Sequence, residues 1–516
     1  MAIAAGNADA AATPMAGSSR AIVTICVMTA ALMEALDSTI ANVALPYMRG
    51  SLATTSYQIE WVLTSYIVAA AIMTPATGWL DARFGRRPVF LVCVFGFLTF
   101  SMLCGTATNI TQIVLYRLMQ GMFGAPLVPL SQAILLDIYP RSQRGQAMAI
   151  FGVGVMLGPI LGPLLGGYLT QYYDWRWVFY VNVPFGIFAF VLGWFFVSEA
   201  DEVASEKLDW FGFGVLAMAI GALQLFLDRG QQLNWFQSTE IKIEFALFLL
   251  GVYLFIVHTL TARRPFLDSR LFADRNFVVG QILIFLVGAI LFATLSLMSP
   301  YLENLMNYPV FTAGLVLAPR GLGTMVAMWM VGQLISRVDV KWLLLSGLAL
   351  TAYSLYEMSK FTQDISQFTI IWTGVVQGFG LGFVFVPLST VTFVTLPSSL
   401  TAQATGCFNL MRNVGSSVGI SVTTFLLTRN SDIMHSALAN HISPYSRAVQ
   451  SLDPATIDIA TEKGKAIVNE MVTAQAQNIA YEDNYRLMMY LTLLTMPLVF
   501  LLRNTKPIKP GAPRPG

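Results

Sequence analysis

Residues 31–46 read ALMEALDSTIANVALP and contain two acids, Glu34 and Asp37, within a run that is otherwise apolar, small or hydroxyl-bearing. The run covers residues 21–45, which as a helix is long enough to cross about 30 Å of hydrocarbon. Because carboxylates are unfavourable inside a membrane, acids at such positions predict a functional site. The i, i+3 spacing places both acids on one helix face, and Asn42 lies near that face.

The whole chain has the composition of a polytopic membrane protein. Of its 516 residues, 56% are apolar and 11% are charged, whereas about 25% are charged in an ordinary soluble domain. The net charge of +2 is uninformative, and the lack of a basic patch argues against a nucleic-acid partner. The four cysteines fall within or at the ends of apolar spans, which argues against a disulfide framework. The three histidines are too scattered for a metal site, so we expect no bound metal.

Apolar runs separated by polar or turn-forming stretches predict fourteen membrane-spanning helices. Their expected bounds are 21–45, 57–80, 88–107, 111–136, 146–170, 178–198, 210–227, 241–260, 277–300, 312–335, 342–359, 367–394, 403–428 and 485–502. An even number of spans places both termini on one side. With the N-terminus inside, the inner segments carry seventeen Lys and Arg residues and the outer segments ten, which predicts that both termini are cytoplasmic.

Two pairs of motifs indicate an internal duplication. QGMFGAPLVPLS in residues 116–131 matches QGFGLGFVFVPLS in residues 373–389, and Gly78-x-Leu80-x-x-Arg83-x-x-x-Arg87 matches Gly332-x-Leu334-x-x-Arg337-x-x-x-Lys341. Both matches occur in the same order, which predicts two parallel halves. The expected fold is all-α, with two six-helix bundles and two inserted helices.

The duplication also predicts the division of the chain. We expect a disordered cytoplasmic tail at 1–20, an N-terminal six-helix bundle at 21–198, a linker with two extra transmembrane helices at 199–276, a C-terminal six-helix bundle at 277–502 that includes an external loop at 429–484, and a cytoplasmic tail at 503–516.

Arg117 lies in LYRLMQGMFGAP, inside the fourth span, where an arginine needs a partner. It is roughly 9 Å below the outer end of its span, and Asp37 is roughly 12 Å below the outer end of the first. Comparable depth permits an ion pair that stays charged until a proton or a cationic ligand competes for it. A fixed structural ion pair is the alternative. The second half has Gly374 at the matching position, so the chemistry of Asp37, Glu34 and Arg117 is expected in the N-terminal half alone.

Residues 78–88 read GWLDARFGRRP and predict a short loop with three arginines at the cytoplasmic surface. The loop is either an anchor with a tight turn or a gate latch that docks on a neighbouring helix end or acid in one conformation only. It resembles the loop between the second and third spans of the major facilitator superfamily, but Ala82 stands where the family has its acid, and Asp81 precedes it. Asp137 is expected to be a latch partner or a solvated cap. The expected cytoplasmic gate comprises Gly78, Asp81, Arg83, Gly85, Arg86, Arg87 and Asp137.

The fifth span contains GVGVMLGPILGPLLGGYL at residues 152–169. Small residues let helices approach closely, and two Gly-Pro steps are expected to kink the helix. The pattern resembles the fifth-span motif that marks antiporters of the same superfamily. The expected antiporter helix is defined by Gly154, Gly158, Pro159, Gly162, Pro163, Gly166 and Gly167.

Residues 174–186 follow as DWRWVFYVNVPFG, an aromatic interfacial belt that opens the sixth span. With LDSTIANVALP at 36–46 and the fourteen spans, the chain from about residue 20 onward resembles the 14-span drug:proton antiporters of the major facilitator superfamily, of the multidrug efflux permease type. The resemblance implies efflux of amphipathic or lipophilic drugs across the cell inner membrane by alternating access. A proton gradient is the expected energy source, without a cofactor and without enzyme activity. A periplasmic adaptor and an outer-membrane channel are implied partners.

Two other functions stay open at this point. One is export of a single metabolite class, such as a siderophore, a sugar or a phenolic compound, on the same scaffold. The other is a membrane scaffold or sensor that transports nothing. No Walker sequence supports ATP as the energy source. For a transporter, the residues expected to line the substrate cavity are Asn42, Gln120, Gln132, Arg320, Asn409 and Arg412.

Overall fold

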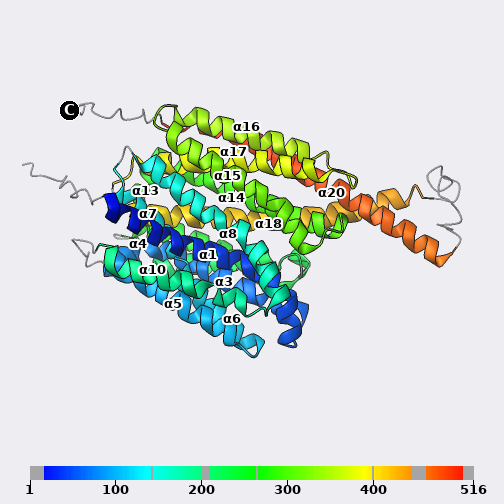
Figure 1. The fold of residues 1–516 in the computed structure, drawn as a ribbon, viewed down its shortest axis with the longest axis horizontal. Helices are drawn as coiled ribbons and strands as arrows, with labels where there is room; N and C mark the ends of the chain where they lie inside the picture. Colours follow the sequence, from blue (N-terminus) through cyan, green and yellow to red (C-terminus); the bar gives the residue numbers. More distant parts are fainter. Residues whose placement is uncertain are drawn as a thin grey trace, which may run out of the picture.

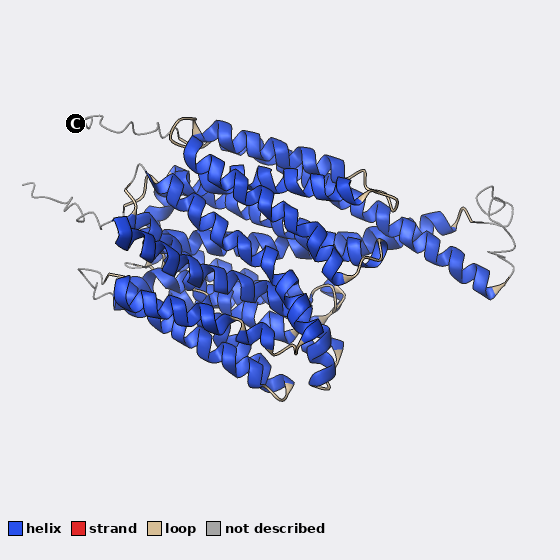
Figure 2. Ribbon diagram, in the orientation of Figure 1, coloured by secondary structure: helices blue, strands red, loops and turns tan. Residues whose placement is uncertain are grey.

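The computed structural model describes residues 17–140, 143–198, 208–262, 265–397, 400–442 and 461–503. Throughout these ranges the secondary structure is helical, without a strand (Figure 2). The long helices of the first part are α1 (Gly17–Ser51), α3 (Trp61–Met73), α4 (Thr77–Phe84), α5 (Arg86–Thr106), α6 (Ile110–Gly124), α7 (Leu127–Ile138), α8 (Arg144–Tyr172) and α10 (Asn182–Phe196). Those that follow are α11 (Trp210–Arg229), α12 (Thr239–Thr261), α14 (Arg275–Pro300), α15 (Val310–Leu334), α16 (Val340–Met358), α17 (Gln367–Phe393), α18 (Thr401–Ala439) and α20 (Glu462–Val499). Short elements connect them: α2 (Ser56–Ile59), η1 (Thr74–Ala76), α9 (Trp177–Tyr180), η3 (Trp235–Gln237), α13 (Ser269–Ala273) and the π-helical η4 (Tyr301–Leu305).

Among the described residues, eleven helices are long and apolar enough to cross a membrane. The other three expected spans, at 342–359, 403–428 and 485–502, correspond to α16, α18 and α20, which are helical over 19, 39 and 38 residues. An all-α membrane protein is therefore confirmed.

Two of the spans are interrupted where the sequence places proline. Pro75 lies in η1, between α3 and α4, and Pro126 is the N-cap residue of α7, directly after α6. Because proline lacks an N–H group and clashes with the preceding turn, it divides a helix at these positions. Elsewhere polar caps begin the helices: the Asn109 side chain accepts from the backbone N–H of Gln112 at the start of α6.

The prediction of a loop over residues 78–88 is wrong. Helix α4 continues to Phe84, α5 begins at Arg86, and Gly85 alone makes the turn, with a φ of 83° that favours glycine. The arginines are therefore held on helix ends. The predicted disordered tail is wrong for residues 17–20, which begin α1; residues 1–16, 504–516 and the loop centre at 443–460 lie outside the described part of the chain.

The helices form two bundles (Figure 1). Helices α1 to α10 gather in one, called here the N bundle, and α14 to α20 gather in the other, the C bundle. The start of α1 and the end of α20 lie at the same end of the molecule, which we call the terminal end. At the opposite end, α18 and α20 extend beyond the other helices.

The two bundles contact each other in the part of the molecule toward the terminal end. Gly332 of α15 lies against α8, where an added Cβ would be 2.8 Å from the Ala149 side chain. Asn409 Nδ2 of α18 donates to Gln132 Oε1 of α7 at 2.9 Å, and both side chains are buried. Gly78 of α4 is equally close to α18, since an added Cβ would lie 2.7 Å from Gln403 Cα. The structure is thus closed on this side.

The inserted helix α11 bridges the bundles. It packs on α3 of the N bundle, and on the C-bundle side the Ser417 hydroxyl of α18 donates to Gln224 Oε1 of α11 at 2.9 Å. A turn further along, the Ser421 hydroxyl donates to the backbone carbonyl of Leu227 at 2.8 Å.

Candidate functional site

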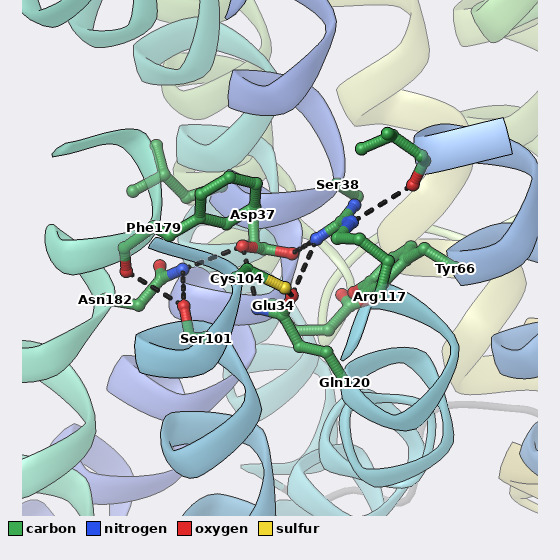
Figure 3. Close-up of polar contacts among 12 residues, drawn as sticks. Glu34, Asp37, Ser38, Tyr66, Ser101, Cys104, Arg117, Gln120, Phe179 and Asn182 are labelled. Carbon is green, nitrogen blue, oxygen red and sulfur yellow. Dashed lines mark hydrogen bonds and ion pairs between the residues drawn. The ribbon is translucent and has the colours of Figure 1, made fainter. Parts of the chain in front are cut away.

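The ion pair that comparable depth permits is formed. Arg117 Nη1 of α6 lies 2.6 Å from Asp37 Oδ2 of α1, and both side chains are fully buried (Figure 3). The helical rise fixes how deep each residue lies, so two positions at similar depth on adjacent spans can meet. A buried pair of this kind is stable only when further hydrogen bonds satisfy both partners.

Two amides satisfy the other oxygen of Asp37. Oδ1 accepts from Asn182 Nδ2 of α10 at 2.7 Å and from Gln120 Nε2 of α6 at 3.0 Å. Asn182 Nδ2 also lies 3.1 Å from the Ser101 hydroxyl oxygen of α5. Three donors on two oxygens match an ionised carboxylate, which only accepts hydrogen bonds.

Aromatic rings and a carbonyl enclose the guanidinium of Arg117. Its centre lies 4.0 Å from the ring centroid of Tyr66 and 5.6 Å from that of Phe179. Nε donates to the Val62 carbonyl at 3.2 Å, and Nη1 also donates to Gln120 Oε1 at 2.9 Å. Nη2 is buried without a hydrogen-bond partner. Arg117 therefore keeps several favourable contacts that do not depend on Asp37.

Glu34 is held more loosely than Asp37. It is partly exposed, and its one hydrogen bond with the described residues is long: Tyr66 Oη donates to Oε1 at 3.4 Å. Arg412 of α18, in the C bundle, interacts with it electrostatically without forming an ion pair among the described contacts. Arg412 Nε is itself buried without a partner. The two acids thus have different surroundings, Asp37 inside the N bundle and Glu34 toward the C bundle.

The glycines of α8 pack on the helix that carries both acids. A Cβ atom added at Gly158 would lie 2.5 Å from Ala35. Gly162 is likewise close to Thr39, and Gly166 is close to Ile40. The Thr39 hydroxyl donates to the Gly158 carbonyl at 3.2 Å. The same contact continues at Gly154 but not at Gly167.

Among those residues, Gly154 faces Met28 of α1, whereas Gly167 has nothing within 4 Å of its added Cβ. Pro159 and Pro163 lie inside α8, which continues through both of them over 29 residues.

The charged residues of the expected gate form contacts within the N bundle, whereas Gly78 lies against α18. Arg86 pairs with Asp81 at 2.9 Å and also with Asp137 of α7. Arg87 Nη2 donates to the Trp194 carbonyl at 2.5 Å. Asp81 therefore accepts an arginine although it stands one position before the family's usual acid, while Arg83 is exposed. Whether these pairs change between conformations stays a prediction.

The expected cavity residues do not form one group. Gln120 belongs to the Asp37 site, Gln132 and Asn409 join the bundles, and Asn42 is exposed. Arg320 is buried within the C bundle, where Nη2 donates to the Leu291 carbonyl. Their role in substrate binding stays a prediction.

The sequence reasoning missed Asn182, Tyr66, Ser101 and Cys104 as parts of the Asp37 site. Cys104 Sγ lies 3.6 Å from Gln120 Oε1. The NVP sequence that opens α10 is a signal that could have identified Asn182, since an amide at the start of a span needs partners once it is buried. In the described part of the chain, no group of three or more His, Cys, Asp or Glu side chains is arranged to hold a metal ion.

Comparison with known proteins agrees with this architecture. A family model described as Major Facilitator Superfamily matches residues 27–420. The chain is 33% identical to the fatty acid resistance protein FarB of Neisseria gonorrhoeae over 95% of this chain and 97% of that protein. It is 32% identical to the multidrug export protein EmrB of Escherichia coli K12 over 95% of this chain and 96% of that protein.

Solved structures show the same fold at low sequence identity. The human organic anion transporter MFSD10 gives a TM-score of 0.61 at 15% identity, over 94% of this chain and all of that chain. The proton:xylose symporter XylE gives 0.62 at 12% identity, over 95% and 97%. These likenesses concern the arrangement of the helices alone.

Proposed function

Because the chain belongs to the major facilitator superfamily, we propose that it exports amphipathic or lipophilic compounds across the cell inner membrane in exchange for protons. The observation that carries the proposal is the buried pair of Asp37 and Arg117. Relatives named for multidrug export and fatty acid resistance support the direction of transport. The matched family is one of transporters, and we expect no enzyme activity.

Proton binding at Asp37 is the proposed coupling step. A proton on Asp37 turns one acceptor oxygen into a donor, so the donors from Arg117, Gln120 and Asn182 no longer all fit. Arg117 retains its contacts with Gln120 Oε1, the Val62 carbonyl and the Tyr66 ring. The arginine can therefore stay in place while α1 and α10 rearrange around the neutral acid. The two protonation states then favour two conformations.

Glu34 is proposed to link this step to the substrate. It lies one turn from Asp37 on α1, is partly exposed, and interacts with Arg412 of the opposite bundle. A change in its charge therefore acts between the bundles, whereas a change at Asp37 acts within one. Helix α8, packed on α1 through Gly158, would transmit a movement of α1 to the bundle interface.

Alternating access requires that the bundles open at one end and close at the other. Contacts such as Gln132 with Asn409 close the terminal end. We propose that this end faces the cytoplasm, as the Lys and Arg distribution predicts, and that the bundles are the units at 21–198 and 277–502 with the extra helices in 199–276. The gate residues around Arg86 would then lie at the cytoplasmic surface.

Export of one metabolite class is the alternative, supported by the relative whose name refers to fatty acids alone. Susceptibility of a deletion strain to unrelated toxic compounds separates the two functions. Sensitivity to one chemical class only would contradict multidrug export. A periplasmic adaptor with an outer-membrane channel is a further proposal, tested by crosslinking in intact cells.

Proton release from the purified protein tests the proposal directly. On addition of an exported compound, the wild type should release protons, and Asp37→Asn should not, because an amide cannot exchange a proton in this range. Asp432→Asn, at an exposed position in the last turns of α18, is the matched control. Proton-driven transport by Asp37→Asn at the wild-type rate would refute the role of Asp37.

A further inference from the structure

The C bundle contains a counterpart of the Asp37 site with one component missing. Gly78 matches Gly332 in the internal duplication, so Tyr66, twelve residues earlier, matches Arg320. In the fourth span of each half Gln120 matches Gln377, so Arg117, three residues earlier, matches Gly374. The N bundle therefore carries its buried arginine on its fourth span, whereas the C bundle carries one on its second span.

Contacts in the C bundle support this correspondence. Gln377 Nε2 of α17 donates to the Thr294 hydroxyl of α14 at 3.2 Å, as Gln120 Nε2 donates to Asp37 Oδ1 at 3.0 Å. Thr294 thus occupies the place of Asp37, and it is fully buried. Arg320 of α15 lies beside Gly374, where an added Cβ would be 3.6 Å from Arg320 Cβ. The absence of a side chain at Gly374 leaves the room into which Arg320 extends.

Arg320 lacks the anion that Arg117 has. It is 6% exposed, and its one hydrogen bond runs from Nη2 to the Leu291 carbonyl at a long 3.4 Å. Within the described ranges no carboxylate pairs with it; the ionisable group that interacts with it is the Tyr485 phenol. Gln377 Oε1, whose counterpart in Gln120 accepts from Arg117, is buried without a partner. A buried guanidinium without a counter-ion is unfavourable, so an anion is expected to join it.

We propose that the position bounded by Arg320, Gln377 and Thr294 binds the negatively charged head group, a carboxylate, of an amphiphilic substrate. Arg320 supplies the planar donors that suit a carboxylate. The Thr294 hydroxyl donates to the Ile290 carbonyl at 2.6 Å and bounds the position on the α14 side. Buried apolar side chains of α14 next to Thr294, among them Ile290 and Leu297, suit the alkyl part. The substrate's own carboxylate takes the place that Asp37 fills in the N bundle. This inference rests on the proposed function, because it takes the anion to be the exported compound.

Binding to the purified protein, in nanodiscs of zwitterionic lipid at neutral pH, tests the site without any proton gradient. The probes are dodecanoate and two ligands with the same chain, dodecanol and dodecyltrimethylammonium. Arg320→Gln keeps hydrogen-bonding capacity without charge, and it should weaken dodecanoate binding by about ten- to a hundredfold, while binding of the other two probes changes little. Arg320→Lys should lose less, and Arg429→Gln on the exposed part of α18 should lose nothing.

Thr294→Asp provides a second, independent variant. It gives Arg320 an internal carboxylate like that of Asp37, so the variant should fold and should no longer bind dodecanoate. Wild-type dodecanoate affinity in folded Arg320→Gln or Thr294→Asp would overturn the proposal. So would displacement of dodecanoate by phosphatidylglycerol at equal amounts, which would assign the site to a lipid. If Asp37→Asn transports normally while Arg320→Gln loses dodecanoate, proton coupling at Asp37 fails and the anion site stands.

Discussion

Gly158→Ala should separate the two helices that carry the proposed coupling. The added Cβ would lie 2.5 Å from the Ala35 carbonyl carbon and 2.7 Å from its oxygen, whereas an ordinary contact is 3.4–4 Å. The obstacle is backbone, which cannot rotate away as a side chain can, so α1 and α8 must move apart by roughly 1 Å. Overpacking of this kind costs about 1–3 kcal/mol. Alanine also gains about 0.5–1 kcal/mol over glycine in a helix, which leaves a net loss of up to about 2.5 kcal/mol.

Gly167→Ala is the matched control on the same helix. Nothing lies within 4 Å of its added Cβ, so the helix-propensity gain remains and the variant should be more stable than wild type by about 0.5–1 kcal/mol. The two substitutions therefore have opposite signs although their chemistry is identical. Thermal unfolding of the purified proteins measures the difference, and substrate-induced proton release measures its effect on Asp37. Equal stability of the two variants, with unchanged proton release, would refute the close packing of α1 on α8.

Three further predictions concern single polar contacts. Asn182→Ala removes the amide that donates to Asp37 at 2.7 Å. The variant should release fewer protons and show a changed pH profile of transport, while substrate binding persists. A wild-type pH profile would contradict this role of Asn182. Gln132→Leu removes the 2.9 Å hydrogen bond with Asn409 between the bundles. The closed state should lose about 1 kcal/mol of stability, which lowers its population relative to the open state roughly fivefold. Distances between spin labels across the terminal end measure this population. Hydrogen bonds from Arg270 lower the pKa of Asp268. The ionised Asp268 therefore makes a small contribution to stability that is present above the ordinary pKa of an aspartate and is lost as the pH falls through the lowered pKa. Asp268→Asn should reduce the loss of thermal stability on acidification, which thermal unfolding at several pH values measures.

The sequence predicts well what depends on regular helix geometry. The depth of Asp37 and Arg117 follows from a constant rise per residue, and the pair indeed forms. The glycine spacing on α8 follows from the same periodicity, although it does not show that Gly167 lies outside the contact.

Contacts that depend on how distant spans pack were not predictable in the same way. Asn182 is 145 residues from Asp37 in the chain. In the sequence its amide is only a polar side chain next to an aromatic belt, and its contact with Asp37 is seen only when α10 lies beside α1. Residues 78–88 were expected to form a loop because glycines and arginines are common there, but a single positive φ at Gly85 is enough for the turn. That no carboxylate of the described residues pairs with Arg320 becomes visible only when α14 and α17 are both in place.

The inserted helix α11 also makes the two sides of the bundle interface unequal. On its side, α3 and α18 are joined through α11, with hydrogen bonds at Ser417 and Ser421. Opening the bundles there requires that these two bonds break or that α11 leaves α3. Separation of the bundles on this side therefore has to break contacts of α11, whereas α8 and α15 contact each other directly at the bundle interface.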